Sequence, residues 1–472
     1  MTRRQVAVLV AGLILLVVAA VTGLAVRATP TGPLLWSVAL DGFPQSIVVD
    51  AQTHRAFITT IPSGVGSASM NVLDTDTGAI LRRVAIGGNW NPLPVVDERA
   101  GRVVVAASVR VRSGPGVTGM VRVLDARSGA LVRTVTVGLF PQGVVVDEQT
   151  GRAFVASEGL TGTGLVGVLN TRTGRLVRTV NVGMEPHDQI LVDTRRERVF
   201  VPVYSQTGDG HVRVLDARTG RPLYTFAAGK APVWMAMDAH AGRAFVINGA
   251  GTDLRVLDTR NGRLLRTVLA SLHPSLLLVD EQTGRAFVPT NVGVSVLDTR
   301  SGAVLRTVAV GQGRLAGLPL LDARRGRVFA VISSLARAPL PGSVFVLDAR
   351  SGAVVRRVAL GGSPGGVAVD ERAGRVVVLT GGLPGTINHV SILDARTGAI
   401  LHTLPVGVAA HAMAVDERNG HVFVINGPGF VILPDSWAWL PSWLRRRLPF
   451  LPPPGRHSRP VPGGVTMIDP TR

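Results

Sequence analysis

Five residues in the middle of the chain have types and spacing that could hold a metal ion. Glu185, His187 and Asp188 precede one predicted strand, and Asp209 and His211 precede a later one. Imidazole nitrogens and carboxylate oxygens are common ligands of divalent cations. These five residues are therefore the candidate metal site, and no other cofactor is evident. Their spacing matches no established zinc motif, so solvated loop residues are the competing interpretation.

Residues 427–463 contain a second candidate site, of a different kind. The segment is rich in proline, tryptophan and arginine, and its candidate contact residues are Trp437, Trp439, Trp443, Arg445, Arg446 and Arg447. Tryptophan beside arginine is typical of membrane interfaces and of protein-binding hot spots. A lid packed on the rest of the fold is the third alternative.

The composition excludes several classes of chemistry. The chain has 472 residues, of which 46 % are hydrophobic, with 56 glycines, 30 prolines and no cysteine. Without cysteine there is no disulfide, no Cys-ligated zinc, no c-type haem attachment and no thiol nucleophile. The sequence also lacks the G-x-S-x-G, H-E-x-x-H and P-loop motifs. Many glycines and prolines indicate many short strands joined by turns.

The formal charge of +19 does not indicate a nucleic-acid partner. Lys230 is the only lysine, and arginines are spread along the whole chain rather than gathered into a dense basic run. Only two tyrosines are available to stack on bases. We therefore expect no nucleic acid among the partners.

The first 33 residues predict a membrane anchor. Gln5 to Val26 contains no charged residue, and Arg3, Arg4 and Arg27 flank it. A helix of that length matches a hydrocarbon core of about 30 Å, and the arginines favour a cytoplasmic N-terminus. We expect a transmembrane signal anchor at residues 1–28 and a linker at 29–33, with the remainder periplasmic or extracellular. A cleaved secretory signal is the alternative, which would make the protein secreted.

Two sequence landmarks alternate from residue 34 to the C-terminus. The first is D-x-x-x-G-R between apolar triplets, intact at six positions and degraded at Asp50, Asp193 and Asp416. Its aspartates recur every 42 to 50 residues, at Asp50, Asp97, Asp147, Asp193, Asp238, Asp280, Asp322, Asp370 and Asp416. The second is V-L-D-x-x-x-G. The decapeptide VDEQTGRAFV even occurs twice without change, at 146–155 and 279–288. Asp opening a turn that Gly closes is typical of a β-hairpin.

This repeat predicts an all-β propeller. Each unit holds four strands, and four strands in about 40–45 residues is the pattern of a propeller blade. About nine repeats are present at 34–472, with seven or eight blades as alternatives. The last unit lacks a fourth strand, and LLWSVALDG at 34–42 resembles one. We therefore expect the two terminal strands to pair and close the ring.

The landmarks also predict two different faces. The first landmark forms an inner turn, between the first and second strands of a blade, and the second forms an outer turn, between the third and fourth. Both lie on one face, the turn face, where we expect a solvated rim of arginines and aspartates. The connections of the opposite loop face vary, so we expect a protein or small ligand to bind there. His411 precedes a first strand, which predicts a position near the axis.

The segments GRAFVIN at 242–248 and GHVFVIN at 420–426 resemble the YVTN family of bacterial and archaeal surface propellers. The resemblance covers residues 34–472 and implies an extracytoplasmic propeller. Relatives are mostly seven-bladed, which keeps the blade number open.

Two functions from different classes follow. One is a membrane-anchored binding or scaffold module, which the tryptophan-containing segment favours. The alternative is a propeller enzyme, a metal-assisted lactonase-like hydrolase or an oxidoreductase on the loop face. Only the cluster around His187 and His211 favours the enzyme.

Overall fold

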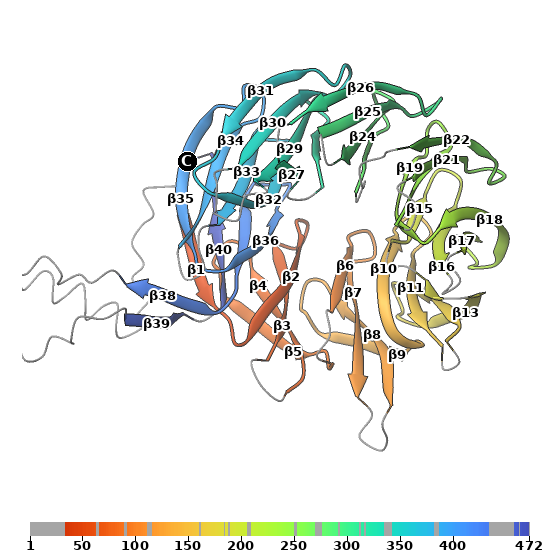
Figure 1. Cartoon of the computed structure of the whole chain (residues 1–472). Coiled ribbons are helices and arrows are strands. Elements are labelled where there is room, and N and C mark those ends of the chain that lie inside the picture. The colour runs from red at the N-terminus through yellow and green to blue at the C-terminus, as the bar shows by residue number, and fades with distance from the viewer. Residues whose placement is uncertain are drawn as a thin grey trace, which may run out of the picture.

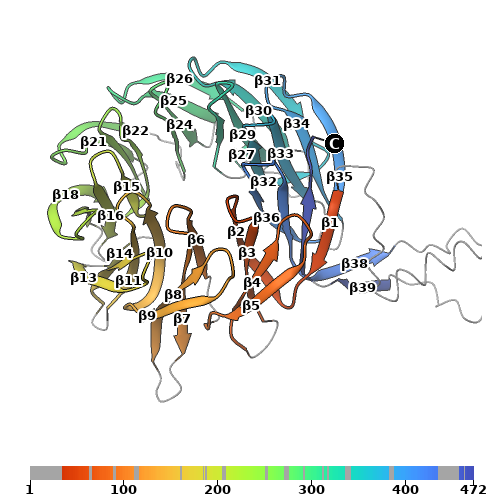
Figure 2. The same cartoon turned by 180° about the vertical axis from the view of Figure 1, so that it is seen from behind.

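The computed structural model shows a closed ring of small antiparallel sheets. It describes residues 34–471 apart from 63–65, 89–91, 111–115, 160–161, 184, 187–188, 205–208, 250–252, 270–275, 291–292, 311–312, 316–317, 335–341, 382–386, 434–456 and 462. Nine sheets are blades of four strands in meander order. The innermost strands contact one another in cyclic order around the axis, as Figures 1 and 2 show from opposite sides. The all-β propeller is confirmed, with nine blades.

The strand bounds follow the repeat closely. Blades one to three are β2 (Phe43–Asp50), β3 (Arg55–Ile61), β4 (Ser69–Asp74), β5 (Ile80–Ala85); β6 (Leu93–Asp97), β7 (Arg102–Arg110), β8 (Val117–Asp125), β9 (Leu131–Thr136); and β10 (Leu139–Asp147), β11 (Arg152–Glu158), β12 (Gly164–Asn170), β13 (Leu176–Gly183). Blades four to six are β14 (Glu185–Pro186), β15 (Leu191–Asp193), β16 (Arg198–Tyr204), β17 (Asp209–Asp216), β18 (Pro222–Lys230); β19 (Pro232–Asp238), β20 (Arg243–Asn248), β21 (Asp253–Asp258), β22 (Leu264–Leu269); and β23 (Leu278–Asp280), β24 (Arg285–Thr290), β25 (Gly293–Asp298), β26 (Val304–Ala309).

Blades seven to nine complete the ring. They are β27 (Gly313–Leu315), β28 (Leu320–Asp322), β29 (Arg327–Ser334), β30 (Ser343–Asp348), β31 (Val354–Ala359); β32 (Ser363–Asp370), β33 (Arg375–Gly381), β34 (Asn388–Asp394), β35 (Ile400–Gly407); and β36 (Ala410–Val415), β37 (Val422–Asn426), β40 (Gly464–Ile468), β1 (Leu34–Ala39). In blades four and seven the first strand is split in two. That strand pairs on one side only, so an interruption there breaks few ladder hydrogen bonds.

Blade nine closes the ring as the sequence predicts. β1 pairs antiparallel with β40, and the register sets Ala39 opposite Gly464. Trp36 then packs on the ring of Phe423 from β37, with centroids 5.9 Å apart. The segment between β37 and β40 is the predicted insertion. Its two ends form a hairpin that the sequence did not predict, β38 (Gly429–Leu433) with β39 (His457–Val461), which projects from the ring in Figure 1.

The core lies between neighbouring blades. The second strand of seven blades contains a fully buried phenylalanine, two residues after the arginine or histidine that follows the inner turn: Phe57, Phe154, Phe200, Phe245, Phe287, Phe329 and Phe423. Each buried aromatic ring of this size stabilises the fold by about 1.5–3 kcal/mol. Within the described residues no helix is long and apolar enough to span a membrane. The predicted anchor at 1–28 and the linker at 29–33 lie outside them.

Eight of the nine blades have an arginine directly after the inner turn, and six of these arginines donate to a carbonyl of the next blade. Nη1 of Arg243 donates to Asp258 Oδ2 in the outer turn of its own blade at 2.9 Å, and Nε donates to the carbonyl of Arg300 in the next blade at 3.2 Å. The same ion pair joins Arg55 to Asp74, Arg102 to Asp125, Arg285 to Asp298, Arg327 to Asp348 and Arg375 to Asp394, at 2.8–3.4 Å. These six arginines pair with the other turn of their own blade, so this part of the expected solvated rim is half-buried.

The outer-turn aspartates are held in the charged form. The backbone N–H of Ser128 lowers the pKa of Asp125, against burial that raises it, and the Ser128 hydroxyl and Arg102 lower it further. The outer-turn glycine is required for a separate reason. Gly352 has a φ of +67°, and a Cβ there would lie 2.6 Å from Val296 of the preceding blade.

The inner-turn aspartates are buried, and a threonine completes their hydrogen bonding. Asp147 Oδ1 accepts the N–H of Gln149, and its Oδ2 accepts the hydroxyl of Thr150 at 2.7 Å. At Asp97, Asp370 and Asp416, where alanine or asparagine replaces that threonine, Oδ2 has no hydrogen-bond partner among the described residues. A buried carboxylate oxygen without a donor costs stability.

We therefore expect Ala100→Thr to stabilise the protein by about 1 kcal/mol, because the new hydroxyl donates to Asp97 Oδ2. Urea denaturation measures the change. Thr150→Ala, the reverse substitution in blade three, is the matched control and lowers stability by a similar amount. A destabilised Ala100→Thr variant would show that Oδ2 does not need the donor.

A chain that begins at Asp41 lacks β1 and leaves β40 as an unpaired edge, so we expect a large fall in its melting temperature and aggregation through that edge. A chain that begins at Leu34 keeps β1 and is the control, with an unchanged melting temperature. Scanning calorimetry compares the two. Equal melting temperatures would contradict a role for β1 in closure.

Candidate binding site on the turn face

The structure tests little of the predicted metal site. β14 begins at Glu185 and β17 at Asp209, and β16 pairs with both strands, so these residues reach the same end of blade four. His211 is exposed on β17. His187 and Asp188 lie outside the described residues. Among the residues that are described, no group of three or more histidines and carboxylates could hold a metal ion, and the metal site stays a prediction.

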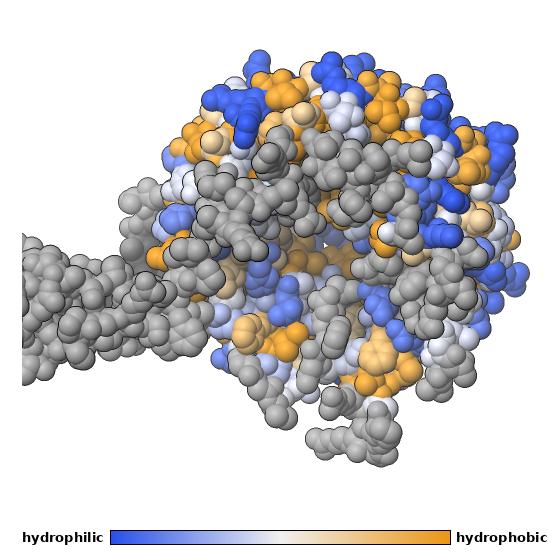
Figure 3. Space-filling model, in the orientation of Figure 1, coloured by the Kyte–Doolittle hydropathy of each residue, from blue (hydrophilic) through white to orange (hydrophobic). Residues whose placement is uncertain are grey.

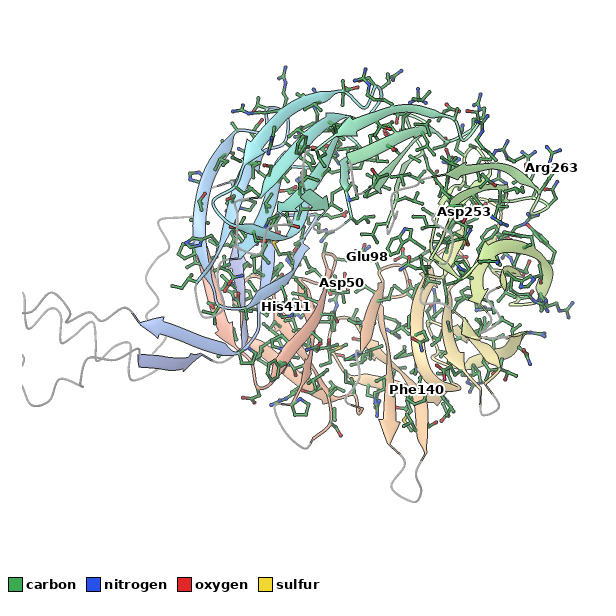
Figure 4. The ribbon with its side chains drawn as sticks, viewed as in Figure 1. Asp50, Glu98, Phe140, Asp253, Arg263 and His411 are labelled. Atoms are coloured by element: carbon green, nitrogen blue, oxygen red, sulfur yellow. The ribbon has the colours of Figure 1, made fainter. Side chains whose placement is uncertain are left out.

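The predicted partner or membrane contacts also remain predictions. Trp437, Trp439, Trp443, Arg445, Arg446 and Arg447 all fall within 434–456, outside the described residues. His411 lies toward the centre of the ring in Figure 4. Its Nε2 contacts the carbonyl oxygen of Pro44 in blade one at 3.0 Å. This histidine therefore joins the last blade to the first.

The inner turns surround the axis with charged side chains, and we call this region the mouth. Figure 3 shows that the molecule is hollowed at the centre of the ring, and Figure 4 places Asp50 and Glu98 there. The two residues after each inner-turn aspartate form the mouth. They include five glutamates, Glu98, Glu148, Glu281, Glu371 and Glu417, and five arginines, Arg99, Arg195, Arg324, Arg372 and Arg418.

Hydrogen bonds between blades hold many of these side chains in place. Glu148 accepts the backbone N–H of Glu98, and Glu281 and Glu371 accept the equivalent N–H of Ala239 and Ala323. In a second set the side chain belongs to the earlier of the two blades and donates to the next. Arg372 donates to the carbonyl of Arg418, Arg418 to that of Ala51, and Gln52 to the carboxylate of Glu98. The mouth is therefore a fixed array of charges.

The carboxyl group of Glu98 lies among other carboxylates of the mouth. Burial raises its pKa, and the nearby carboxylates of Asp50, Glu148 and Glu417 raise it further, against the hydrogen bond from Gln52 that lowers it. A cation near this arc of carboxylates would relieve their mutual repulsion. The arc extends over blades one, two, three and nine.

A cavity of about 400 Å³ opens beside the mouth between blades seven, eight and nine. Leu320, Leu321 and Val369 supply apolar lining, and five charged residues supply the rest: Arg324, Asp370, Glu371, Arg372 and Glu417. A second cavity of about 670 Å³ lies on the same face across blades four to six, next to Arg195, His240 and Arg300. Turn residues contribute to the lining of both cavities.

Sequence reasoning did not identify the mouth as a site. The turn residues were predicted to have only a structural role, and the ligand was predicted to bind on the loop face. The available signal was the glutamate after the inner-turn aspartate, present in five of nine repeats at Glu98, Glu148, Glu281, Glu371 and Glu417. A turn needs the aspartate and the glycine but does not need that glutamate.

Comparison with known proteins supports the fold more than a function. A family model described as outer membrane protein assembly factor BamB matches residues 117–273, which is the stretch from β8 to the end of blade five. No curated protein shows significant sequence similarity to the chain. The match covers about a third of the chain. The chain is therefore a nine-bladed propeller of which residues 117–273 are similar to the BamB family.

Solved propellers of diverse proteins resemble the ring. A eukaryotic initiation factor has a TM-score of 0.58 and 12 % identity, over 80 % of this chain and 90 % of that one. The quinohemoprotein alcohol dehydrogenase from Comamonas testosteroni has a TM-score of 0.51 and 13 % identity, over 93 % and 76 %. The computationally designed Ika8 protein has a TM-score of 0.51 and 15 % identity, over 79 % and 100 %. At these identities the likeness shows the fold alone.

Because the pKa of Glu98 is raised, we predict that Glu98→Gln increases the stability of the folded protein in a pH-dependent way. A carboxyl group whose pKa is raised on folding costs stability once the pH exceeds its unfolded pKa of about 4.3. We therefore expect the variant to be more stable than the wild type at pH 7, with the difference vanishing below about pH 4. Melting temperatures across pH 3–8 measure it. Glu158→Gln, away from the mouth, is the control, and a pH-independent loss in Glu98→Gln would contradict the expectation.

Proposed function

We propose that this chain is a membrane-anchored, extracytoplasmic binding scaffold that holds a protein partner on the mouth of its turn face. The observation that carries the proposal is the ring of inter-blade hydrogen bonds, such as those of Glu148 and Arg418, which fixes glutamates and arginines around the axis. Groups held in place before binding lose little conformational entropy when a partner docks.

The charges of the mouth favour a protein partner over a ligand of one sign. Carboxylates and guanidinium groups interleave there, so complementary charges on a partner would set both its position and its orientation. Arg99 and Glu148 are both exposed at neighbouring turns. The loop face and the segment at 427–463 remain further surfaces for partners.

Three further features support the location and the class of partner. The family model that matches blades two to five is named for an assembly factor, which supports an assembly role here. The apolar run within 1–28 supports a single-pass anchor with the propeller outside the cytoplasm. The FVIN segments at 245–248 and 423–426 support a place among YVTN-type surface propellers. Likeness to a dehydrogenase shows fold alone, so catalysis is not proposed.

Site-specific photocrosslinking in cells tests the scaffold. We expect a crosslinkable residue at Glu148 or Gln149, both exposed on an inner turn, to give a discrete adduct with another protein. The same residue at Leu305 on the outer strand β26, which is 52 % exposed, is the matched control and gives none. Adducts from position 305 alone, or from none of the three, would contradict docking at the mouth.

A further inference from the structure

The outer turns of blades three, four and five each carry two arginines, whereas those of blades one, two, six, seven and eight carry one or none. The first lies two residues after the residue that opens the turn, and the second directly follows the glycine that closes it. We call these six residues the basic arc: Arg172, Arg175, Arg218, Arg221, Arg260 and Arg263. All six are exposed, and Figure 4 shows Arg263 at the outer edge of the ring.

The turn itself does not need the second arginine. In the other five of these blades an alanine follows the glycine: Ala79, Ala130, Ala303, Ala353 and Ala399. The hydrogen bond that closes the turn is the same with either residue. The N–H of Asp216 donates to the carbonyl of Arg221 at 2.9 Å, and the N–H of Asp348 donates to the carbonyl of Ala353 at 2.9 Å. Turn geometry therefore does not explain the arginines of the basic arc.

Few carboxylates offset the charge of the basic arc. Arg218 pairs with Glu197, and the other five guanidinium groups have no acidic partner among the described residues. In blade three Asn170 even replaces the aspartate that opens the turn. The outer strands of these blades, β13, β18 and β22, contain no acidic residue. A positive surface without counter-charges attracts an anionic partner.

Exposed aliphatic side chains lie directly beside these arginines. Leu176 and Val177 follow Arg175, and Leu223 and Leu264 stand at the start of the next two outer strands, all 39–47 % exposed. Figure 3 shows hydrophilic and hydrophobic residues side by side along the outer edge of the ring. A lipid surface binds both kinds of group, because aliphatic side chains enter the acyl boundary while arginines contact the headgroups. The combination therefore favours a membrane over a purely polar anionic polymer.

The entry of the chain into the ring brings the turn face close to a membrane. Leu34, the first described residue, pairs with Ile468 at the turn-face end of blade nine. The five residues between the proposed anchor and Leu34 span at most about 18 Å. Blade nine and blade four lie on opposite sides of the ring (Figure 1). When the turn face lies toward the membrane, the anchor and the basic arc therefore reach the same surface from opposite sides.

We infer that the basic arc binds anionic phospholipid headgroups and holds the ring with its turn face toward the membrane. The guanidinium groups pair with lipid phosphates in charge-assisted hydrogen bonds, and the aliphatic side chains beside them enter the acyl boundary. The inference rests on the anchored placement proposed above and deepens it, because a partner that docks at the mouth is then a membrane protein. Lipid contact is measured separately from docking, so either can fail alone.

Fluorescence quenching by lipid in the full-length protein tests the contact. The chain has no cysteine, so Leu223→Cys or Lys230→Cys carries the only fluorophore, near the turn-face end or at the loop-face end of β18. The protein is combined with phosphatidylcholine nanodiscs that contain headgroup-spin-labelled lipid, with or without phosphatidylglycerol. We expect at least about twofold stronger quenching at position 223 with phosphatidylglycerol than without it, and little quenching at position 230. The difference disappears at about 1 M NaCl, where the Debye length is about 3 Å.

Two results would overturn the inference. Equal quenching at position 223 with and without phosphatidylglycerol would show that the charges of the basic arc do not contact lipid. Stronger quenching at position 230 than at position 223 would show that the turn face does not lie toward the membrane. Neither result would change the crosslinking expected at Glu148, and an absence of quenching would leave the basic arc to a soluble acidic partner.

The variant Arg175→Ala/Arg221→Ala/Arg263→Ala gives three turns the alanine that the other blades have, so we expect an unchanged melting temperature. With the fluorophore at position 223, its quenching in phosphatidylglycerol nanodiscs falls to the level in pure phosphatidylcholine. Arg221→Ala alone lowers the NaCl concentration that abolishes quenching. Lys230→Ala removes the same charge from the other end of β18, and this matched control leaves that concentration unchanged. Full quenching in the folded triple variant would overturn the role of the basic arc.

Discussion

The ring depends on one interaction, that of the guanidinium group that follows the inner turn in eight of the nine blades. It joins the two turns of its own blade through an aspartate, as Arg102 does with Asp125, and it reaches a carbonyl of the following blade. Apart from the hydrogen bonds of the mouth, neighbouring blades meet mainly through apolar side chains, which pack without fixing a direction. Charge-assisted hydrogen bonds are directional. The tie therefore sets the rotation of each blade against the next, while buried phenylalanines such as Phe154 supply most of the stabilising free energy.

The arginine contact between neighbouring blades is incomplete in blades seven and eight. Nε of Arg327 and Nε of Arg375, in blades seven and eight, have no hydrogen-bond partner among the described residues. At these joints the connection moves inward, to Arg325 with the carbonyl of Glu371 and Arg372 with that of Arg418. The cavity between blades seven, eight and nine lies at the same joints. The sector that joins its blades differently is thus also the sector that contains this cavity.

Much of the fold was predictable from the chain, whereas the site was not. Asp147 and Gly151 mark one turn wherever they occur, because a carboxylate and a positive φ suit few other conformations. The pairing of β1 with β40 was also predictable, since an unfinished last repeat needs its missing strand. Two features were missed: the hairpin of β38 and β39, and the split first strands of blades four and seven. Neither belongs to the pattern that the repeats share, so comparing the repeats could not predict them. The mouth was missed because its residues come from nine turns that are distant in sequence.

By itself, the sequence determined the blade, its four strands, its two turns and the order in which they recur. These are local properties of spacing, turn chemistry and apolar alternation within some 45 residues. Only the tertiary structure decided that Arg243 pairs with the other turn of its blade, that Glu98 lies near Glu148 and Glu417, and that Asp370 lacks the donor that Asp147 has. Those facts depend on ring closure, which brings side chains from separate repeats together and decides which of their polar atoms remain without a partner.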